Sequence, residues 1–247
     1  MTAVSTLRIG NWFQGPTGSG QGGWTSQRFL AAVSACTDQP MTVSLAAAIP
    51  LEVDLEVHAV ADDHSRWELR APDGTTIMTA SVWNPVFADT SPVSIADARA
   101  AHHRSSDVVG EHPVPACFSC GSLPGSMQVQ AGPVDLSGAD DRFATHWTVP
   151  DWAVDAAGVV DPGTLWAALD CCAAFWVGWS REPRTALTVQ YAVEERVPLT
   201  PGATYAVVGW SGDHDPEWDG RKRHGASAAF DAEGRCVARS VSFWVSV

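Results

Sequence analysis

The two halves of the chain repeat one order of elements: a glycine-bearing loop, then a helix, then four strand-like runs. In the first half, loop 21–23 precedes a helix predicted over 24–36 and strands predicted over 41–48, 53–60, 64–71 and 75–83. In the second half, loop 161–163 precedes a helix predicted over 164–179 and strands predicted over 185–193, 204–210, 225–230 and 236–245. The pattern predicts an α+β fold of two tandem units, each with a central helix wrapped by an antiparallel sheet.

The boundaries of the two units follow from the segment between the copies. We expect an N-terminal unit over 1–88, a linker over 89–114 and a C-terminal unit over 115–247. The linker contains Pro92 and a short helical pattern over 95–103. The second copy also carries a polar loop over 211–222 that the first copy lacks.

Composition excludes several classes of protein. Lys and Arg total 15 against 28 Asp and Glu, a formal net charge of −13, so we expect no nucleic-acid partner. The most apolar stretch, 165–179, is interrupted by Asp170 and is shorter than the ~18 residues that span a bilayer. No signal-peptide pattern opens the chain. Six cysteines are too few for a disulfide scaffold in a chain of this length. We therefore expect a cytoplasmic protein that does not bind membranes.

Asp170 is the one carboxylate within the second helix, whose other residues leave no polar face. Aspartate has low helix propensity, and an ionised carboxylate is costly to bury. One interpretation is a structural carboxylate held by hydrogen bonds near a strand edge or water. The other is a catalytic carboxylate with a raised pKa in an apolar cleft, and we favour this second interpretation.

The spacing around Asp170 resembles a known family. Asp161-Pro162-Gly163, six residues and then Asp170 is similar to the His-Gly-Gly-(six)-Asp signature of hotdog-fold thioesterases of the phenylacetate-pathway type, in which the last Asp is the catalytic acid. The first copy is similar, as Gln21-Gly22-Gly23, six residues and Leu30. Over nearly the whole chain the order of elements also resembles the double hotdog of acyl-CoA thioesterase II. The resemblance implies a double-hotdog fold.

In such proteins the resemblance implies a composite site, with backbone N–H groups from one helix start and the carboxylate from the partner helix. A helix N-terminus offers free N–H donors and a positive dipole end to a developing oxyanion. Gly22 and Gly23 would then be the donors for a site completed by Asp170. The reciprocal pairing offers Leu30 in place of the acid and Pro162, which has no N–H. We therefore predict one active and one inactive site.

Further residues are assigned to the site by the same resemblance. Where the family has His at the helix start, this chain has Gln21 or Asp161. Acyl-CoA thioesterase II combines its Asp with a Thr and a Gln on neighbouring strands. Thr188 matches the first, and Ser242 stands at the position of the second. Among the tryptophans, Trp24 and Trp166 are predicted to line the acyl pocket.

One dense basic cluster, 220–224, stands out in the acidic chain. It is either a solvated turn or a binding site for the phosphates of coenzyme A or of a carrier's phosphopantetheine, formed by Arg221, Lys222 and Arg223.

The motif Cys117-Phe118-Ser119-Cys120 is a single CxxC. A zinc site needs about four ligands and usually shows a second CxxC or paired histidines. We therefore expect a turn that packs two thiols, and no metal.

These observations favour an acyl thioester hydrolase acting on acyl-CoA or on acyl groups of a carrier protein. No cofactor is expected, since coenzyme A would be part of the substrate. Related folds usually pair further through their sheet edges, which otherwise remain exposed, so the resemblance implies a homo-oligomer. One alternative is a hotdog dehydratase, hydratase or cyclase of a biosynthetic pathway, for which His146 or His224 would have to reach Asp170. Another is a non-catalytic acyl-group binding protein in which Asp170 is only structural.

Overall fold

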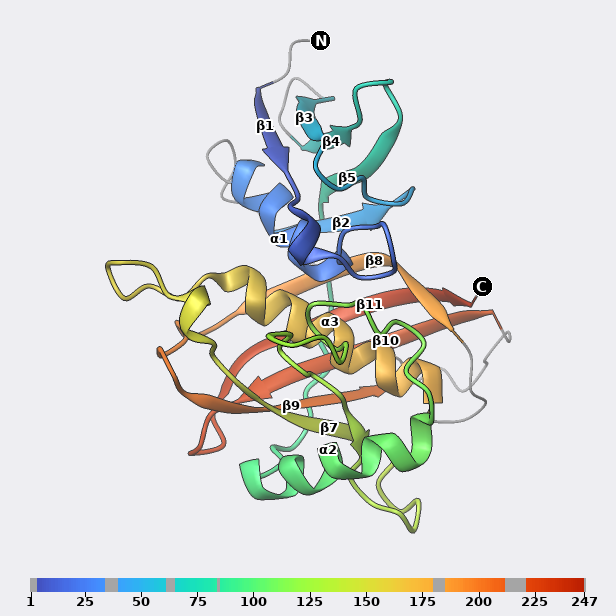
Figure 1. The fold of residues 1–247 in the computed structure, drawn as a ribbon, viewed down its shortest axis with the longest axis vertical. Coiled ribbons are helices and arrows are strands. Elements are labelled where there is room, and N and C mark those ends of the chain that lie inside the picture. The colour runs from blue at the N-terminus through green and yellow to red at the C-terminus, as the bar shows by residue number, and fades with distance from the viewer. Residues whose placement is uncertain are drawn as a thin grey trace.

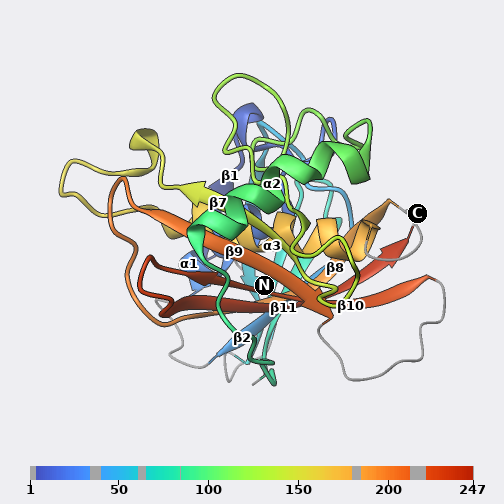
Figure 2. The ribbon, with the colours of Figure 1, turned by 90° about the horizontal axis from the view of Figure 1, so that it is seen from below.

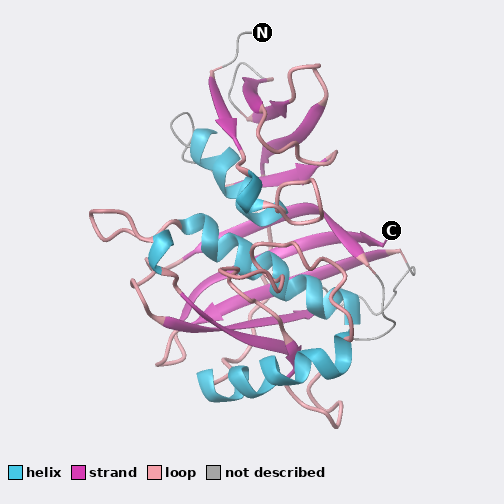
Figure 3. Cartoon of the chain, in the orientation of Figure 1, coloured by secondary structure: helices cyan, strands magenta, loops and turns pink. Residues whose placement is uncertain are grey.

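A computed structural model describes residues 4–33, 40–60, 65–83, 85–179, 185–211 and 221–246. Within these residues, one continuous antiparallel sheet of 11 strands carries three α-helices (Figures 1 and 3). The strands lie in the order β1-β3-β4-β5-β2-β8-β11-β10-β9-β7-β6. The first five belong to the N-terminal half of the chain and the other six to the C-terminal half.

Both halves use one order of elements. The N-terminal half contains β1 (Ser5–Arg8), a 3-10 helix (Asn11–Phe13), α1 (Gly22–Val33), β2 (Met41–Leu45), β3 (Asp54–Ala59), β4 (Arg66–Arg70) and β5 (Thr76–Val82). The C-terminal half contains β7 (Phe143–Thr148), a 3-10 helix (Asp151–Ala153), α3 (Pro162–Trp179), β8 (Ala186–Glu195), β9 (Thr204–Ser211), β10 (Lys222–Phe230) and β11 (Cys236–Ser246). In each half the strand after the helix pairs with the last strand.

The two predicted helices and all eight predicted strands are present. β1 and β7, which precede the helices, were not predicted. β1 has only four residues, none of them fully buried. β7 mixes apolar and polar residues without strict alternation. Both become strands because they pair with the second strand of their half, β3 and β9. The predicted extension of the first helix to residue 36 lies outside the described residues.

The halves meet along two contacts. β2 pairs antiparallel with β8, with Val43 opposite Tyr191 and Ser44 opposite Gln190. On the inner face of the sheet, α1 packs against α3. The N-terminus of α1 is thereby brought onto the middle of α3.

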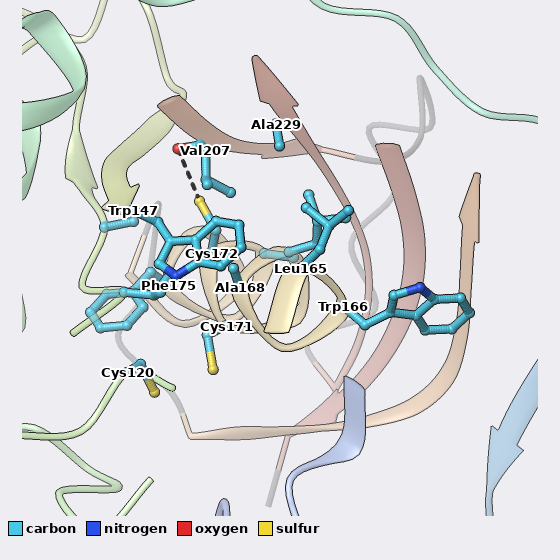
Figure 4. Close-up of a cluster of buried hydrophobic side chains, with 14 of the residues drawn as sticks. Cys120, Trp147, Leu165, Trp166, Ala168, Cys171, Cys172, Phe175, Val207 and Ala229 are labelled. Carbon is cyan, nitrogen blue, oxygen red and sulfur yellow. Dashed lines mark hydrogen bonds between the residues drawn. The ribbon is translucent and has the colours of Figure 1, made fainter. Parts of the chain in front are cut away.

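Helix α3 is enclosed almost completely, as its lack of a polar face predicted. Strands β7 to β11 curve around it (Figures 1 and 2), and its side chains fill the largest core cluster with residues from β7, β8 and β9 (Figure 4). Because this helix is buried, any polar group that it carries must find partners inside the protein.

The segment expected as a linker with a short helix forms α2 (Ile95–Val109), which is longer than predicted and is docked. Ser94 caps it by accepting a hydrogen bond from the Asp97 N–H. Ala98 and Ala101 of α2 pack against Ala206 and Ala228 on the face of the sheet opposite α3. The two-residue strand β6 (Gly132–Pro133) completes the sheet edge. None of the helices in the described part of the chain has the length and apolar character needed to span a membrane.

Candidate active site

Asp170, on α3, is only 4% exposed and accepts three hydrogen bonds. Its Oδ2 accepts from the Gln21 side-chain amide at 2.6 Å and from the Gly23 backbone N–H at 3.1 Å. Its Oδ1 accepts from the Thr188 hydroxyl at 2.8 Å. The donors come from the start of α1 and from β8, so the carboxylate lies where the two halves meet.

The N-terminus of α1 explains two of these donors. Gln21 caps the helix: its side-chain oxygen accepts the Trp24 N–H at 2.6 Å, which leaves its NH₂ group to bond Asp170. Gly23 is in the first turn, where N–H groups have no partner inside the helix. Asp170 therefore occupies the position of an anion at the positive end of the α1 dipole.

Two opposing effects act on the pKa of Asp170. Burial, which penalises the charged form, is the largest effect and, with a smaller electrostatic effect of Cys117, raises the pKa to about 7, while hydrogen bonds from Thr188, Gly23 and Gln21 lower it. A carboxyl group with this pKa is available in both protonation states near neutral pH. It is therefore suited to take up or release a proton.

Gly23 permits the close approach of α1 to α3. A Cβ at this position would lie 2.5 Å from the backbone oxygen of Trp166 and 2.8 Å from the Cβ of Asp170. Gly22 is more open, since its nearest neighbours would be the tip of Leu45 at 3.2 Å and the Asp170 carboxylate at 3.4 Å. Gly22, Leu45 and Thr188, which surround the carboxylate, are partly exposed.

The two glycine amides predicted as oxyanion donors are not equivalent. The Gly23 N–H is bound to Asp170. In the described part of the chain no hydrogen bond engages the Gly22 N–H, whose residue starts the helix. Of the two amides, only that of Gly23 is therefore engaged by the carboxylate.

A β-bulge directs Thr188 toward Asp170. In the pairing of β8 with β11, Gln190 is opposite Phe243 and Thr188 is opposite Trp244, so Val189 is the extra residue. Tyr191 points toward α3 and bonds the Trp166 carbonyl. Strict alternation would turn Thr188 away from α3, and the bulge returns it to the inner face. The sequence gives no signal for this bulge.

The reciprocal position lacks the same parts. Leu30 is partly buried and packs against the apolar core. Asp161 caps its own helix by accepting the Gly163 N–H at 2.9 Å and also pairs with Arg28. On β2, Thr42 faces away from the helices, because β2 pairs with β5 without a bulge. The structure therefore builds the carboxylate arrangement around Asp170 alone.

A cavity of about 450 Å³ lies beside this reciprocal position. Aromatic and charged side chains line it, among them Phe13, Trp24, Arg28, Trp152 and Asp161. The Arg28 guanidinium lies 4.2 Å above the Trp24 ring, which itself stacks on Phe13. Trp24 was predicted to line the acyl pocket at Asp170, but its ring lines this cavity beside the reciprocal position instead.

Two more predicted residues are engaged elsewhere. The indole N–H of Trp166 donates to Glu195 at 2.7 Å, although its backbone contacts the site. Ser242 donates to the Gly225 carbonyl at 3.0 Å and accepts from the Trp244 indole, so its described hydrogen bonds do not reach Asp170.

The basic cluster does not form one exposed patch. Arg221 and Lys222 are exposed, but Arg223 is 1% exposed on β10. The prediction of a three-residue phosphate site was wrong for Arg223, since strand alternation turns this side chain into the protein. Gly220 lies outside the described residues.

Neither histidine required by the dehydratase alternative reaches Asp170. His146 is on β7 with its ring 5.0 Å from His102 of α2, on the other face of the sheet. His224 packs on Phe243, and its neighbours in alternation, Ala226 and Ala228, also face away from α3. The sheet separates both imidazoles from the carboxylate.

Comparison with known proteins fixes the fold. No protein-family model matches the chain, and no curated protein matches it by sequence. A Novosphingobium aromaticivorans protein provisionally named a thioesterase aligns with 97% of this chain and 94% of its own, at a TM-score of 0.58 and 12% identity. A protein of unknown function with a hot dog fold from Alicyclobacillus acidocaldarius aligns with 98% of this chain and 92% of its own, at a TM-score of 0.54 and 15% identity. The chain has a hotdog fold.

A further solved structure aligns with less than half of the chain. The PaaI protein of the Escherichia coli phenylacetic acid degradation operon aligns with 43% of this chain and 73% of its own, at a TM-score of 0.38 and 12% identity.

Proposed function

We propose that the chain hydrolyses acyl thioesters at a composite site formed by the N-terminus of α1 and Asp170 of α3. The observation that carries the proposal is the buried carboxylate, which lies at a helix N-terminus and accepts hydrogen bonds from Gly23 and Thr188. Of two structural relatives that align with nearly the whole chain, one is described as having a hot dog fold and the other is provisionally named a thioesterase.

The chemistry follows from the atoms present. The Gly22 N–H would polarise the thioester carbonyl and then stabilise the oxyanion, helped by the α1 dipole. Asp170 would either remove a proton from the attacking water and pass it to the leaving thiolate, or attack the carbonyl itself to form a mixed anhydride that a water molecule then hydrolyses, regenerating the carboxylate and supplying the thiolate with its proton. Thr188 would hold the Oδ1 atom in place. The thiol of coenzyme A, or of a carrier's phosphopantetheine, leaves.

We further propose that the fold is a double hotdog. Each half has the order strand, helix and four strands. The five strands of each half also pair in the same order, β1-β3-β4-β5-β2 in the first half and β7-β9-β10-β11-β8 in the second. The isolated bridges Gln14–Gly20 and Val154–Val160 recur before α1 and α3. Fusion of two copies would free one of the two sites to lose its acid, as Leu30 illustrates.

The proposal is tested by following thiol release from short-chain, long-chain and aromatic acyl-CoAs and from the matching acyl carrier thioesters. We expect turnover of at least one class. If melting temperature rises with acyl-CoA but no thiol is released with any substrate, the protein is an acyl-group binder and the hydrolase proposal is wrong.

Thr188→Val should lower kcat/KM about 10-fold to 100-fold, since a hydrogen bond to a charged group contributes about 1.5–3 kcal/mol. The variant keeps the side-chain shape and leaves Oδ1 without its donor. The control is Thr42→Val, which removes a buried hydroxyl that has no partner in the described part of the chain and faces the other side of the sheet. Steady-state kinetics of the two variants should differ; equal rates would exclude a role for Thr188.

A further inference from the structure

Three cysteines from two separate segments converge beside α3. Cys117 and Cys120 lie in the segment between α2 and β6, and Cys171 lies on α3. Their Sγ atoms are all within 4.8 Å of one another, and the Cys117–Cys171 separation is 3.9 Å. All three are buried. The sequence shows only the CxxC pair, and the fold adds the third thiol.

The turn that carries the CxxC pair is firmly built. The Gly121 N–H donates to the Cys117 carbonyl at 2.8 Å, and a Cβ on Gly121 would lie 2.4 Å from that same oxygen. The Ser119 hydroxyl donates to the Ala167 carbonyl of α3 at 3.1 Å, and the Phe118 N–H donates to Gln14. The two sulfur atoms are therefore fixed against α3 by the backbone.

The burial of the three sulfur atoms favours a bound cation. Metal ions bind cysteine in its thiolate form, and buried thiolates need a compensating positive charge, which a metal ion held between them would supply.

The spacing of the three sulfur atoms fits one metal ion. For equilateral triangles with edges from 3.9 to 4.8 Å, the centre lies about 2.3–2.8 Å from each corner, and the Zn–S bond is about 2.3 Å. Sulfur ligands select Zn²⁺ and Cu⁺ over hard cations, and Zn²⁺, which usually takes four ligands, would need one ligand more than these three sulfur atoms. The Gln21 amide, 3.7 Å from the Cys171 sulfur, would supply a hydrogen bond to the bound thiolate.

We propose that Cys117, Cys120 and Cys171 bind one thiophilic metal ion, Zn²⁺ or Cu⁺, which fastens the CxxC turn to α3. Cys172 has no part in this site, since its thiol points to the other side of the helix and bonds the Val207 carbonyl (Figure 4). The proposal does not depend on the hydrolase activity.

The test compares two neighbouring positions on one helix, Cys171→Ala and Cys172→Ala, together with Cys117→Ala. Full-length protein, reduced and freed of metal, is titrated with Zn²⁺ against a chromogenic chelator and, anaerobically, with Cu⁺ against a Cu⁺ chelator. Cd²⁺ serves as a probe for sulfur-to-metal charge-transfer absorption. We expect one equivalent bound to the wild type and to Cys172→Ala, and an affinity loss on the order of 100-fold or more in Cys171→Ala and Cys117→Ala.

The Zn²⁺ and Cu⁺ titrations distinguish the two ions, and tight binding of either ion supports the proposed site. Absence of binding in both arms, or unchanged affinity in the folded Cys117→Ala protein, would overturn it. So would a Cys117–Cys120 disulfide found by mass spectrometry in protein isolated without reductant. Melting temperature gives an independent readout: metal should raise it in the wild type and in Cys172→Ala but not in Cys171→Ala.

Discussion

Gly23→Ala should destabilise the protein by about 2–3 kcal/mol and greatly reduce any activity, because overpacking a tight contact costs about 1–3 kcal/mol and sometimes more. The added methyl group would meet the Trp166 carbonyl at 2.5 Å and Asp170 at 2.8 Å. Neither is the end of a flexible side chain, so α1 must move away from α3. That movement also separates the Gly23 N–H from the carboxylate.

The matched control is Gly22→Ala, one residue earlier in the same helix turn. Its new methyl group would meet the movable tip of Leu45 at 3.2 Å. We expect its free energy of unfolding in urea to stay within about 1 kcal/mol of the wild type, since alanine also has the higher helix propensity. Equal destabilisation of the two variants would mean that the close approach at Gly23 does not hold the helices together.

Asp170→Asn should lower kcat/KM at least ~100-fold, which corresponds to about 2.7 kcal/mol of transition-state stabilisation. The variant removes both the base and the nucleophile that the proposed chemistry needs. It keeps the size of the side chain, so the surrounding core should be preserved. Thiol release from the preferred acyl thioester measures the effect, and a loss of less than about threefold would remove Asp170 from the mechanism.

The same substitution should stabilise the protein at higher pH. Burial raises the pKa of Asp170 from 3.8 to about 7. Between these values the folded protein holds a proton that the unfolded chain has released, so the free energy of unfolding falls as pH rises from about 4 to about 7. Asparagine does not titrate, and the advantage of the variant should therefore grow by a maximum on the order of 4 kcal/mol over this interval.

Urea unfolding of both proteins at pH 4, 5.5, 7 and 8 checks this prediction. A difference in unfolding free energy that is constant across these pH values would show that folding does not raise the pKa of Asp170, and it would contradict this prediction.

Much of the fold was accessible from the sequence because its patterns are strong. The helix around Asp170 is apolar on every side, which predicts enclosure, and the strand runs are bounded by turn residues such as Pro72 and Gly74. β1 and β7 were missed because partner strands, and not their own patterns, make them strands. The length of α2 depends on its docking to the sheet.

Some residues of the candidate site were likewise predicted from the sequence, and others were not. The resemblance to hotdog thioesterases predicted that Gly22 and Gly23 share a site with Asp170, because it implies that the helix start of one unit meets the carboxylate of the other. The bulge at Val189 is a property of the pairing of β8 with β11, so the sequence could not indicate that it turns Thr188 inward. Likewise, Cys171 joins Cys117 only through the path of the chain over α3.

The central claim is that one of two similar sites carries the chemistry, and the two helix-associated aspartates test it directly. Asp161→Asn retains a capping residue at the start of α3 and loses only the charge that pairs with Arg28. Thiol release should be measured for Asp170→Asn and Asp161→Asn in parallel, on the substrate that the wild type prefers. The account predicts a loss of at least ~100-fold for Asp170→Asn and of no more than about threefold for Asp161→Asn. Equal losses, or a larger loss in Asp161→Asn, would contradict the composite site at Asp170.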